Sequence, residues 1–309
     1  MEYRALGKTG LKVSALSFGA SSLGSVFRPV DEAEGIRAVH VALNLGINLI
    51  DVSPYYGLTK AETVLGKALK GIPRDTYYLA TKVGRYGDDT FDFSARRVTA
   101  SVDESLARLN AGHVDIIQCH DIEFGHLDQV VGEALPALRQ LQKQGKVRFV
   151  GVTGLPLKIF RHVLDRAEVD TILSYCHYSL NDTSLSMLVP FLKEKQVGII
   201  NASPLSMGLL SDRGAPAWHP ASAEIRAACA RAAALCRARG TDLSKLALQF
   251  SVAHPDVATT LVGTASPQNI ANNVRWLDEP IDQELLSQVM QILLPVRNQT
   301  WPSGRPENN

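Results

Sequence analysis

Short apolar runs alternate with amphipathic stretches along most of the chain. Eight apolar runs end abruptly in a polar residue and a turn, which is typical of buried parallel strands. They cover 13–20, 47–53, 77–84, 114–121, 148–154, 171–178, 197–203 and 259–264. The stretches between them predict helices over 34–46, 62–71, 96–110, 132–145, 157–167, 185–196, 223–240 and 242–254. Several of these stretches end in glycine, as helix C-termini commonly do.

This alternation predicts an α/β fold, a (β/α)8 TIM barrel whose functional site lies at the C-terminal rim of the strands. We expect residues 1–309 to form one domain, since barrels of this kind often use that length. EYRALG and KTGLKV, on either side of Gly7, predict an N-terminal hairpin at the barrel bottom. The Gly-, Pro- and Ser-rich stretch 204–221 predicts a lid or binding loop. The polar tail from about 298 is expected to be disordered or draped on the surface.

Composition narrows the classes of partner. No stretch approaches the roughly 20 apolar residues that span a bilayer, and MEYRALGKTGLKVS lacks the apolar core of a secretory signal. We therefore expect a soluble, cytoplasmic protein. A net charge of +1, with both signs interspersed, provides no surface for nucleic acid or an anionic membrane. A small-molecule substrate is the expected partner, and no obligate protein partner is indicated.

Metal and phosphate motifs are not indicated. The four cysteines have no paired spacing, which predicts reduced thiols in packing roles. Cys119, His120 and Asp121 are adjacent, and neighbouring strand residues point to opposite faces, so they do not form a metal site. GASSLG at 19–24 is not followed by GK[ST], and the Rossmann glycine pattern is absent.

Four side chains stand at the ends of three neighbouring strands: Asp51 and Tyr56 in GINLIDVSPYYG, Lys82 in YYLATKVG and His120 in VDIIQCHD. Consecutive barrel strands are neighbours, so these side chains are expected to converge. Singly, each is explained as a cap, a packing residue or a hydrogen-bonded core residue, but together they indicate a site. Lys82 is expected to lower the pKa of the Tyr56 phenol, and Asp51 to keep Lys82 charged. An acid, a phenol, an amine and an imidazole of this kind point to carbonyl–alcohol redox chemistry.

The chain resembles the aldo-keto reductases in EYRALGKTGLKVSALSFG, DVSPYYG, TKVG, HVDIIQCHD, GKVRFVGVTG, SPLSMGLL and VGTASPQNIANN. The resemblance implies that Asp51, Tyr56, Lys82 and His120 are the catalytic tetrad. It also implies a nicotinamide dinucleotide, NAD, laid across the strand ends without a Rossmann fold. The cofactor residues implied are Gly19, Ala20, Ser21, Asp51, Thr153, Ser174, Ser203, Pro204, Leu205, Met207, Gly208, Gly263, Thr264, Ala265, Ser266, Asn269, Asn272 and Asn273. The substrate residues implied are Tyr56, Tyr86, His120, Asp121 and Phe124.

The chain departs from the family pattern at several cofactor positions. Thr153-Gly154 replaces Ser-Asn, Ser174 replaces a common Gln, and Ala202 replaces an aromatic that stacks on nicotinamide. NADP-using relatives carry a Lys and an Arg in K-S-x-T-P-x-R-x-x-E-N, where this chain has Gly263 and Asn269. The neutral residues predict NAD rather than NADP, unless Arg275 reaches the 2′-phosphate instead.

The resemblance implies NAD-dependent oxidation of an aldose at C1 to a lactone, with L-galactose, on the route to ascorbate, as the expected sugar. An NADPH-dependent aldehyde or ketone reductase is the nearest alternative. A Schiff-base aldolase would use Lys82 as nucleophile, which requires an uncharged amine that Asp51 opposes. A non-catalytic redox-sensing subunit of the same fold is the third alternative.

Overall fold

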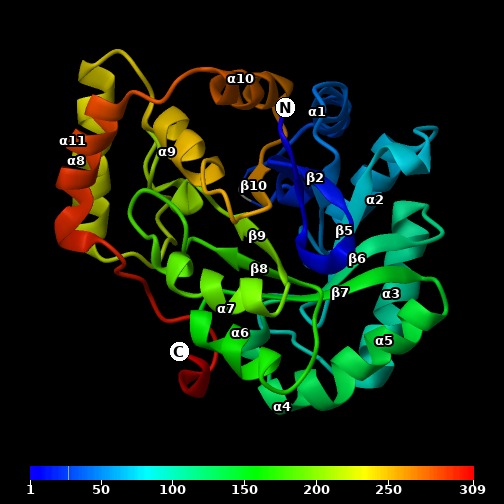
Figure 1. Cartoon of the computed structure of the whole chain (residues 1–309). Coiled ribbons are helices and arrows are strands. Elements are labelled where there is room, and N and C mark those ends of the chain that lie inside the picture. Colours follow the sequence, from blue (N-terminus) through cyan, green and yellow to red (C-terminus); the bar gives the residue numbers. More distant parts are fainter. Residues whose placement is uncertain (27) are drawn as a thin grey trace.

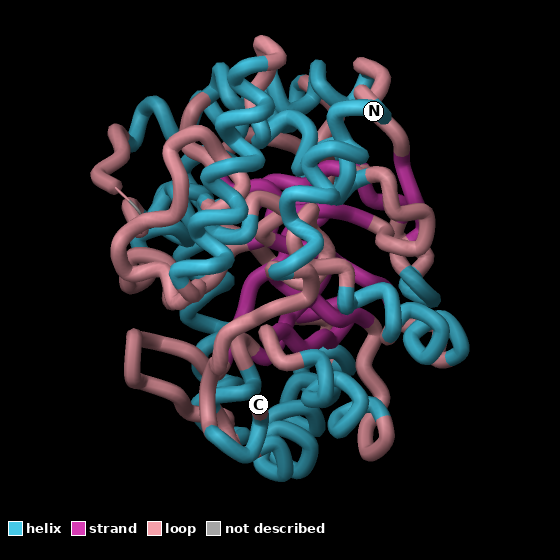
Figure 2. Tube along the Cα trace, turned by 90° about the vertical axis from the view of Figure 1, so that its left-hand side faces the viewer, coloured by secondary structure: helices cyan, strands magenta, loops and turns pink. Residues whose placement is uncertain are grey.

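A computed structural model of the protein describes residues 1–26 and 28–309. Within these residues, eight parallel strands close into a barrel in the order β10-β3-β4-β5-β6-β7-β8-β9. The strands are β3 (Leu16–Gly19), β4 (Leu49–Asp51), β5 (Tyr78–Val83), β6 (Val114–Cys119), β7 (Val147–Gly154), β8 (Thr171–Tyr175), β9 (Gly198–Ala202) and β10 (Thr259–Gly263). They lie at the centre of the molecule with helices around them (Figures 1 and 2). The predicted barrel is confirmed.

The helices around the barrel are α1 (Glu32–Asn44), α2 (Lys60–Leu69), α3 (Ala95–Leu109), α4 (Leu127–Gln129), α5 (Leu135–Lys143), α6 (Leu157–Leu164), α7 (Val189–Glu194), α9 (Leu243–Val252) and α10 (Pro267–Asp278). Two further helices, α8 (Ala223–Ala238) and α11 (Gln283–Leu293), pack side by side against one flank (Figure 1). The sequence pattern did not predict α10 and α11. Ser266 and Asp282 are their N-caps, each accepting a hydrogen bond from a backbone N–H of the first turn, and this capping signal is the one that would have located them.

Apolar side chains fill the barrel interior and close its bottom. Alternate residues on the strands point inward and form one buried cluster with Leu6, Leu11 and Val13. The hairpin of β1 (Tyr3–Ala5) and β2 (Lys12–Ser14) contributes part of this plug, as the sequence predicts. Gly7 has a φ of +52°, and an added Cβ would lie 2.3 Å from the backbone N of Gly198, so the hairpin sits directly against β9. Val13, expected at the start of the first barrel strand, belongs to the hairpin instead.

Two bulk properties accompany the fold. None of the helices in the described part of the chain has the length and apolar character that a bilayer crossing requires. The four cysteines are free thiols in buried positions.

The C-terminal segment is ordered and packs against the rest of the protein. Of the two predictions for this tail, disorder is therefore wrong. Trp301 is only 8% exposed and packs in the cluster formed by α8 and α11, with its ring 4.8 Å from that of His219. Further on, the Asn308 side chain donates to the backbone carbonyl of Glu123 at 2.8 Å. The segment therefore crosses from the α8 and α11 flank to the loop after β6 (Figure 1). The buried indole of Trp301 and the backbone carbonyls that accept hydrogen bonds from Asn308 order this segment. The hydropathy of the sequence does not indicate these contacts.

Trp301→Ala is expected to lower the free energy of unfolding by about 3 kcal/mol, because it removes a buried aromatic side chain and leaves a cavity. Urea unfolding followed by circular dichroism measures this. Met187→Ala is the control, since the Met187 residue is 78% exposed and surface changes stay within about 0.5 kcal/mol. Equal effects of the two substitutions would show that the C-terminal segment does not pack as described.

Candidate active site

The four tetrad candidates meet at the C-terminal rim of the barrel. Asp51 ends β4, Lys82 lies on β5, and His120 follows β6 directly. Lys82 Nζ forms an ion pair with Asp51 and lies 3.3 Å from the Tyr56 hydroxyl. The rings of Tyr56 and His120 are perpendicular, with centroids 5.5 Å apart. The convergence that the strand order predicts is therefore present.

Lys82 is the hub of this cluster. Its side chain is 1% exposed, and Nζ donates to Asp51, to the backbone oxygen of Val52 at 2.9 Å and to Tyr56. Burial alone would lower the pKa of Lys82, but the negative charge of Asp51 and the contact with Tyr56 raise it to about 12. Asp51 thus keeps Lys82 charged, as expected, and a charged amine is not the nucleophile that an aldolase needs.

Gln118 is a site residue that the sequence pattern did not indicate. Its Nε2 donates to the second carboxylate oxygen of Asp51 at 2.8 Å, which leaves the first oxygen for Lys82. Gln118 precedes His120 by two positions and so faces the same side of β6. That period of two is the signal that would have found it.

The environment of Tyr56 corrects one expectation. Burial raises the pKa of the Tyr56 phenol, and the nearby charge of Lys82 offsets only part of this effect, while Asp51 adds to it. The pKa therefore lies above its ordinary value, where the sequence argument predicted a decrease. The ammonium lowers the phenol pKa, but removal of the phenol from water raises it by more. At neutral pH, Tyr56 is a neutral phenol.

A backbone contact sets the place of Tyr56. The turn after β4 includes Gly57, whose φ is +62°, and an added Cβ would lie 2.1 Å from the backbone oxygen of Gly24. A Cβ on Gly24 would in turn lie 2.5 Å from the backbone oxygen of Tyr56. Only two glycines allow this approach, which holds the Tyr56 backbone against the loop after β3.

His120 is a neutral imidazole. Burial lowers its pKa to about 3, against the attraction of Asp121 and together with the positive charges of Lys82 and Arg85. Its Nδ1 atom lies 2.9 Å from the Ser53 hydroxyl, and its Nε2 atom lies 3.6 Å from Asp121 Oδ2.

Arg85 and Asp121 form an ion pair of 2.5 Å beside His120. The backbone N–H of Asp121 donates to the Thr153 hydroxyl at 2.9 Å, so Thr153 is in contact with a residue of the substrate group. The Arg85 guanidinium lies over the Tyr55 ring, 3.8 Å from its centroid. Arg85 and Tyr55 are further residues that the sequence pattern missed. Arg85 forms an isolated β-bridge with Phe91, and Tyr55 stands in the turn after β4.

Two predicted substrate residues lie in different places. Phe124 stacks on Phe91 with ring centroids 4.7 Å apart, and Arg85 lies 5.3 Å from both rings, so Phe124 borders the mouth. Tyr86 instead accepts a hydrogen bond from the backbone N of Gly84 at 3.1 Å, next to α3. Its hydroxyl is turned toward the helix layer, and the structure does not bring it to the tetrad.

Most predicted cofactor residues occupy one sector of the rim. Gly19 is the register partner of both Gly263 and Asp51, which places the ends of β3 and β10 beside the tetrad. Ala20 and Ser21 follow in a short helical turn, and the segment Ser203–Gly208 follows β9, the other neighbour of β10. Thr264, Ala265, Ser266, Asn269, Asn272 and Asn273 lie between β10 and the first half of α10.

Ser174 departs from this arrangement. On β8, Leu173 belongs to the cluster that fills the barrel interior, and Ile172 belongs to the core between barrel and helices. Alternation therefore turns Ser174 outward, toward the helices. Ala202, on the neighbouring strand, faces inward. Ser174 therefore lies apart from the other predicted cofactor residues.

This sector fits a dinucleotide. Gly19 and Gly263 present backbone without side chains, and the nearest atom to a Cβ on Gly263 is the Ser21 hydroxyl at 3.1 Å. The N-terminus of α10, with Ser266 as its cap, faces the same rim, and helix N-termini bind phosphate groups. Within residues 1–26 and 28–309, no group of His, Cys, Asp and Glu side chains is arranged to hold a metal ion.

Known proteins are similar to this chain in sequence and in fold. Residues 15–293 match the profile of the Aldo/keto reductase family. The chain belongs to that family. It is 55% identical to the L-galactose dehydrogenase of Arabidopsis thaliana over 100% of this chain and 99% of the relative. It is 34% identical to the D-arabinose 1-dehydrogenase of Saccharomyces cerevisiae over 78% of this chain and 75% of the relative. The holo form of an aldo-keto reductase from Bacillus halodurans superposes with a TM-score of 0.80 at 29% identity, covering 99% of both chains.

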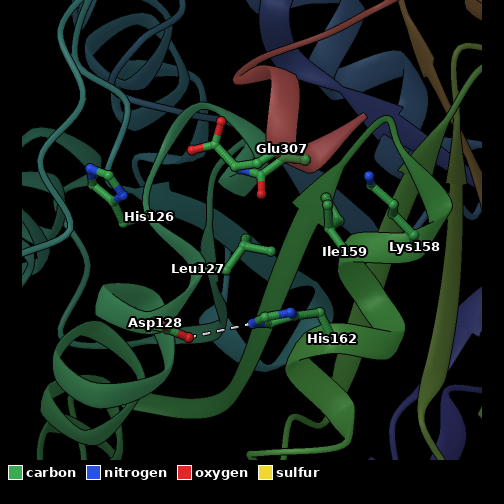
Figure 3. Close-up of a pocket in the computed structure, with 8 residues that line it drawn as sticks. His126, Leu127, Asp128, Lys158, Ile159, His162 and Glu307 are labelled. Carbon is green, nitrogen blue, oxygen red and sulfur yellow. Dashed lines mark ion pairs between the residues drawn. The ribbon is translucent and has the colours of Figure 1, made fainter.

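A separate cavity of about 360 Å³ lies outside the tetrad, between α4, α6 and the C-terminal segment (Figure 3). His126, Asp128 and His162 line it, together with Glu307. His162 and Asp128 lie 3.6 Å apart across it. It contains no residue of the predicted site.

Tyr56→Phe is expected to reduce turnover at least about a hundredfold, because it removes the hydroxyl that we propose exchanges a proton with the substrate. Steady-state kinetics with a saturating nicotinamide cofactor measure the loss, and quenching of protein fluorescence shows that cofactor affinity is retained. Tyr86→Phe is the control and keeps its turnover, since the Tyr86 hydroxyl is turned toward α3. Turnover of Tyr56→Phe within a few-fold of the wild type would remove Tyr56 from the role.

Proposed function

We propose that this aldo-keto reductase oxidises an aldose at C1 to its lactone, with L-galactose as the substrate and NAD as the oxidant. The single observation that carries the chemistry is the contact of the Tyr56 hydroxyl with a buried, charged Lys82 beside a neutral His120. The identity with the Arabidopsis L-galactose dehydrogenase supports the sugar. The yeast relative, a D-arabinose 1-dehydrogenase, supports aldose oxidation as the class.

In this proposal the protein accepts the proton of the substrate C1 hydroxyl and positions the oxygen of that hydroxyl. Tyr56 takes the proton of the C1 hydroxyl, and the Lys82 ammonium at 3.3 Å stabilises the phenolate form that accepts it. His120 orients the same oxygen. NAD, when bound, supplies the acceptor for the hydride that leaves C1. Because burial raises the pKa of Tyr56, alkaline pH favours this direction, and the neutral phenol serves carbonyl reduction as the reverse.

The pair of Arg85 and Asp121 supports a polyhydroxylated substrate. The two side chains are mostly buried at the mouth and lie next to His120. A guanidinium offers donors and a carboxylate offers acceptors, so together they complement hydroxyl groups of fixed stereochemistry. A site of this kind discriminates against an isomer that leaves those groups unpaired. The stacked rings of Phe91 and Phe124 provide an apolar wall for the sugar C–H face.

The preference for NAD rests on charges near α10. Gly263 and Asn269 stand where NADP-using relatives carry Lys and Arg. The alternative cation, Arg275, lies in the last turn of α10, about 13 Å from Ser266 along the helix, and its Nε is 3.5 Å from Glu279 Oε1. Arg275 is paired with Glu279 at the far end of α10 and is not placed to bind a 2′-phosphate. This arrangement supports NAD rather than NADP as the cofactor.

L-galactose is expected to give a kcat/KM at least about tenfold higher than D-galactose, because the wrong enantiomer leaves Arg85 or Asp121 without hydroxyl partners. Absorbance of reduced cofactor over a series of aldoses measures both values. Equal values for the two enantiomers, or activity confined to aliphatic aldehydes, would contradict the proposed substrate.

The wild type is expected to prefer NAD over NADP. The double variant Gly263→Lys with Asn269→Arg is expected to raise kcat/KM with NADP at least about tenfold. The reason is that each charge-assisted hydrogen bond to the 2′-phosphate contributes roughly 1.5–3 kcal/mol. The tightest contact of the new Lys Cβ is the Ser21 hydroxyl at 3.1 Å, which is the end of a short side chain, and the Gly19 backbone oxygen at 3.5 Å is an ordinary contact. Arg275→Ala is the control and leaves the ratio unchanged. Efficient use of NADP by the wild type would refute the preference, and a double variant without gain would refute the alignment of this segment.

A further inference from the structure

Ser53 lies behind His120, on the side of the ring opposite Asp121. It follows β4 by two positions, in the same turn that carries Tyr56, and it is 0% exposed. Its hydroxyl oxygen lies 2.9 Å from His120 Nδ1. Ser53 is the group that contacts the imidazole nitrogen on the side away from Asp121.

The direction of this hydrogen bond follows from the other partner of Ser53. The backbone N–H of Tyr55 donates to the Ser53 oxygen at 3.1 Å, which uses that oxygen as an acceptor. Within residues 1–26 and 28–309, these two are the hydrogen bonds of the Ser53 hydroxyl. If Nδ1 carried the ring proton, the Ser53 proton would be buried without an acceptor, which is unfavourable. With the proton of Ser53 directed at Nδ1, both the hydroxyl and Nδ1 have a hydrogen-bond partner.

We propose that Ser53 is a positioning residue that donates its proton to His120 Nδ1 and thereby keeps the ring proton on Nε2. A neutral imidazole has one donor and one acceptor nitrogen, and the partner of one nitrogen fixes the state of the other. Nε2 lies 3.6 Å from Asp121 Oδ2, beyond hydrogen-bonding distance, on the side of the mouth. Its proton is therefore available to the oxygen on C1.

This tautomer matters for the proposed function, on which the catalytic part of the inference rests. As Tyr56 removes the proton of the C1 hydroxyl, negative charge develops on that oxygen, and a donor at Nε2 stabilises it. The opposite tautomer would direct a lone pair at the same oxygen. Ser53 acts through His120 and does not itself touch the reacting atoms.

The tautomer is measurable without substrate. Long-range ¹⁵N–¹H spectra of histidine-labelled enzyme distinguish a protonated from an unprotonated ring nitrogen, and His120→Gln assigns the signal among the eight histidines. The wild type is expected to show the proton on Nε2 across pH 5 to 8, since burial holds the pKa of His120 at about 3. Ser53→Ala is expected to show a mixture of tautomers, and Ser53→Thr, which retains the hydroxyl, restores the Nε2 form.

Kinetics provide the second readout. Ser53→Ala is expected to lower kcat for sugar oxidation about tenfold with little change in KM, because part of the ring population no longer presents a donor, while Ser53→Thr recovers most of the loss. Ser251→Ala is the matched control: it removes a buried serine hydroxyl that donates to the backbone oxygen of Tyr178 at 3.1 Å, away from the tetrad.

Two results would overturn the inference: a proton on Nδ1 in the wild type, or Ser53→Ala with an unchanged spectrum and the kcat of Ser251→Ala. If Ser53→Ala does not fold, the wild-type spectrum and Ser53→Thr still decide the question. Failure of the proposed function appears differently, as a wild type that oxidises no aldose while its histidine spectrum shows the expected tautomer.

Discussion

The buried ion pair between Lys82 and Asp51 is the interaction on which the site depends. Neither charge is stable alone in the barrel interior, and removing one partner of such a pair destabilises a protein by about 3–5 kcal/mol. Gln118 and the backbone of Val52 satisfy the remaining polar atoms. The pair therefore fixes a permanent ammonium next to the Tyr56 phenol, and this ammonium offsets part of the rise in the phenol pKa that burial causes. That fixed positive charge contacts the Tyr56 hydroxyl, and it adds to the burial that keeps His120 neutral.

The barrel explains how a small number of residues can form the site. Each strand end delivers one side chain to the rim, and the closed order of strands makes neighbours of residues that are about thirty positions apart in the sequence, as in a βαβ unit. Lys82 and Gln118, for example, are register partners on β5 and β6. The helices contribute little to the chemistry and much to the burial that determines the pKa values.

The sequence was informative where a local pattern coincides with a structural constraint. Apolar runs ending in Asp51, Lys82 and His120 located the strands and the tetrad, because strand ends of a barrel converge. It failed where the cause is long-range: the raised pKa of Tyr56 depends on burial by distant segments, and the ordered segment around Trp301 depends on contacts with His219. Ser174 was misplaced because motif matching ignored the alternation of β8. Arg85 and Ser53 act from turns, where no periodicity indicates direction.

The contact between Gly24 and Gly57 makes the position of Tyr56 independent of the side chains that line the mouth. The Tyr56 backbone is held by a contact between main-chain atoms, so a substitution of side chains at this contact does not shift the phenol by small steps. Arg85, Phe91 and Phe124, by contrast, contribute side chains to the mouth of the site. Substitutions of these mouth side chains therefore change the surface that faces a substrate without altering the backbone contact that holds Tyr56.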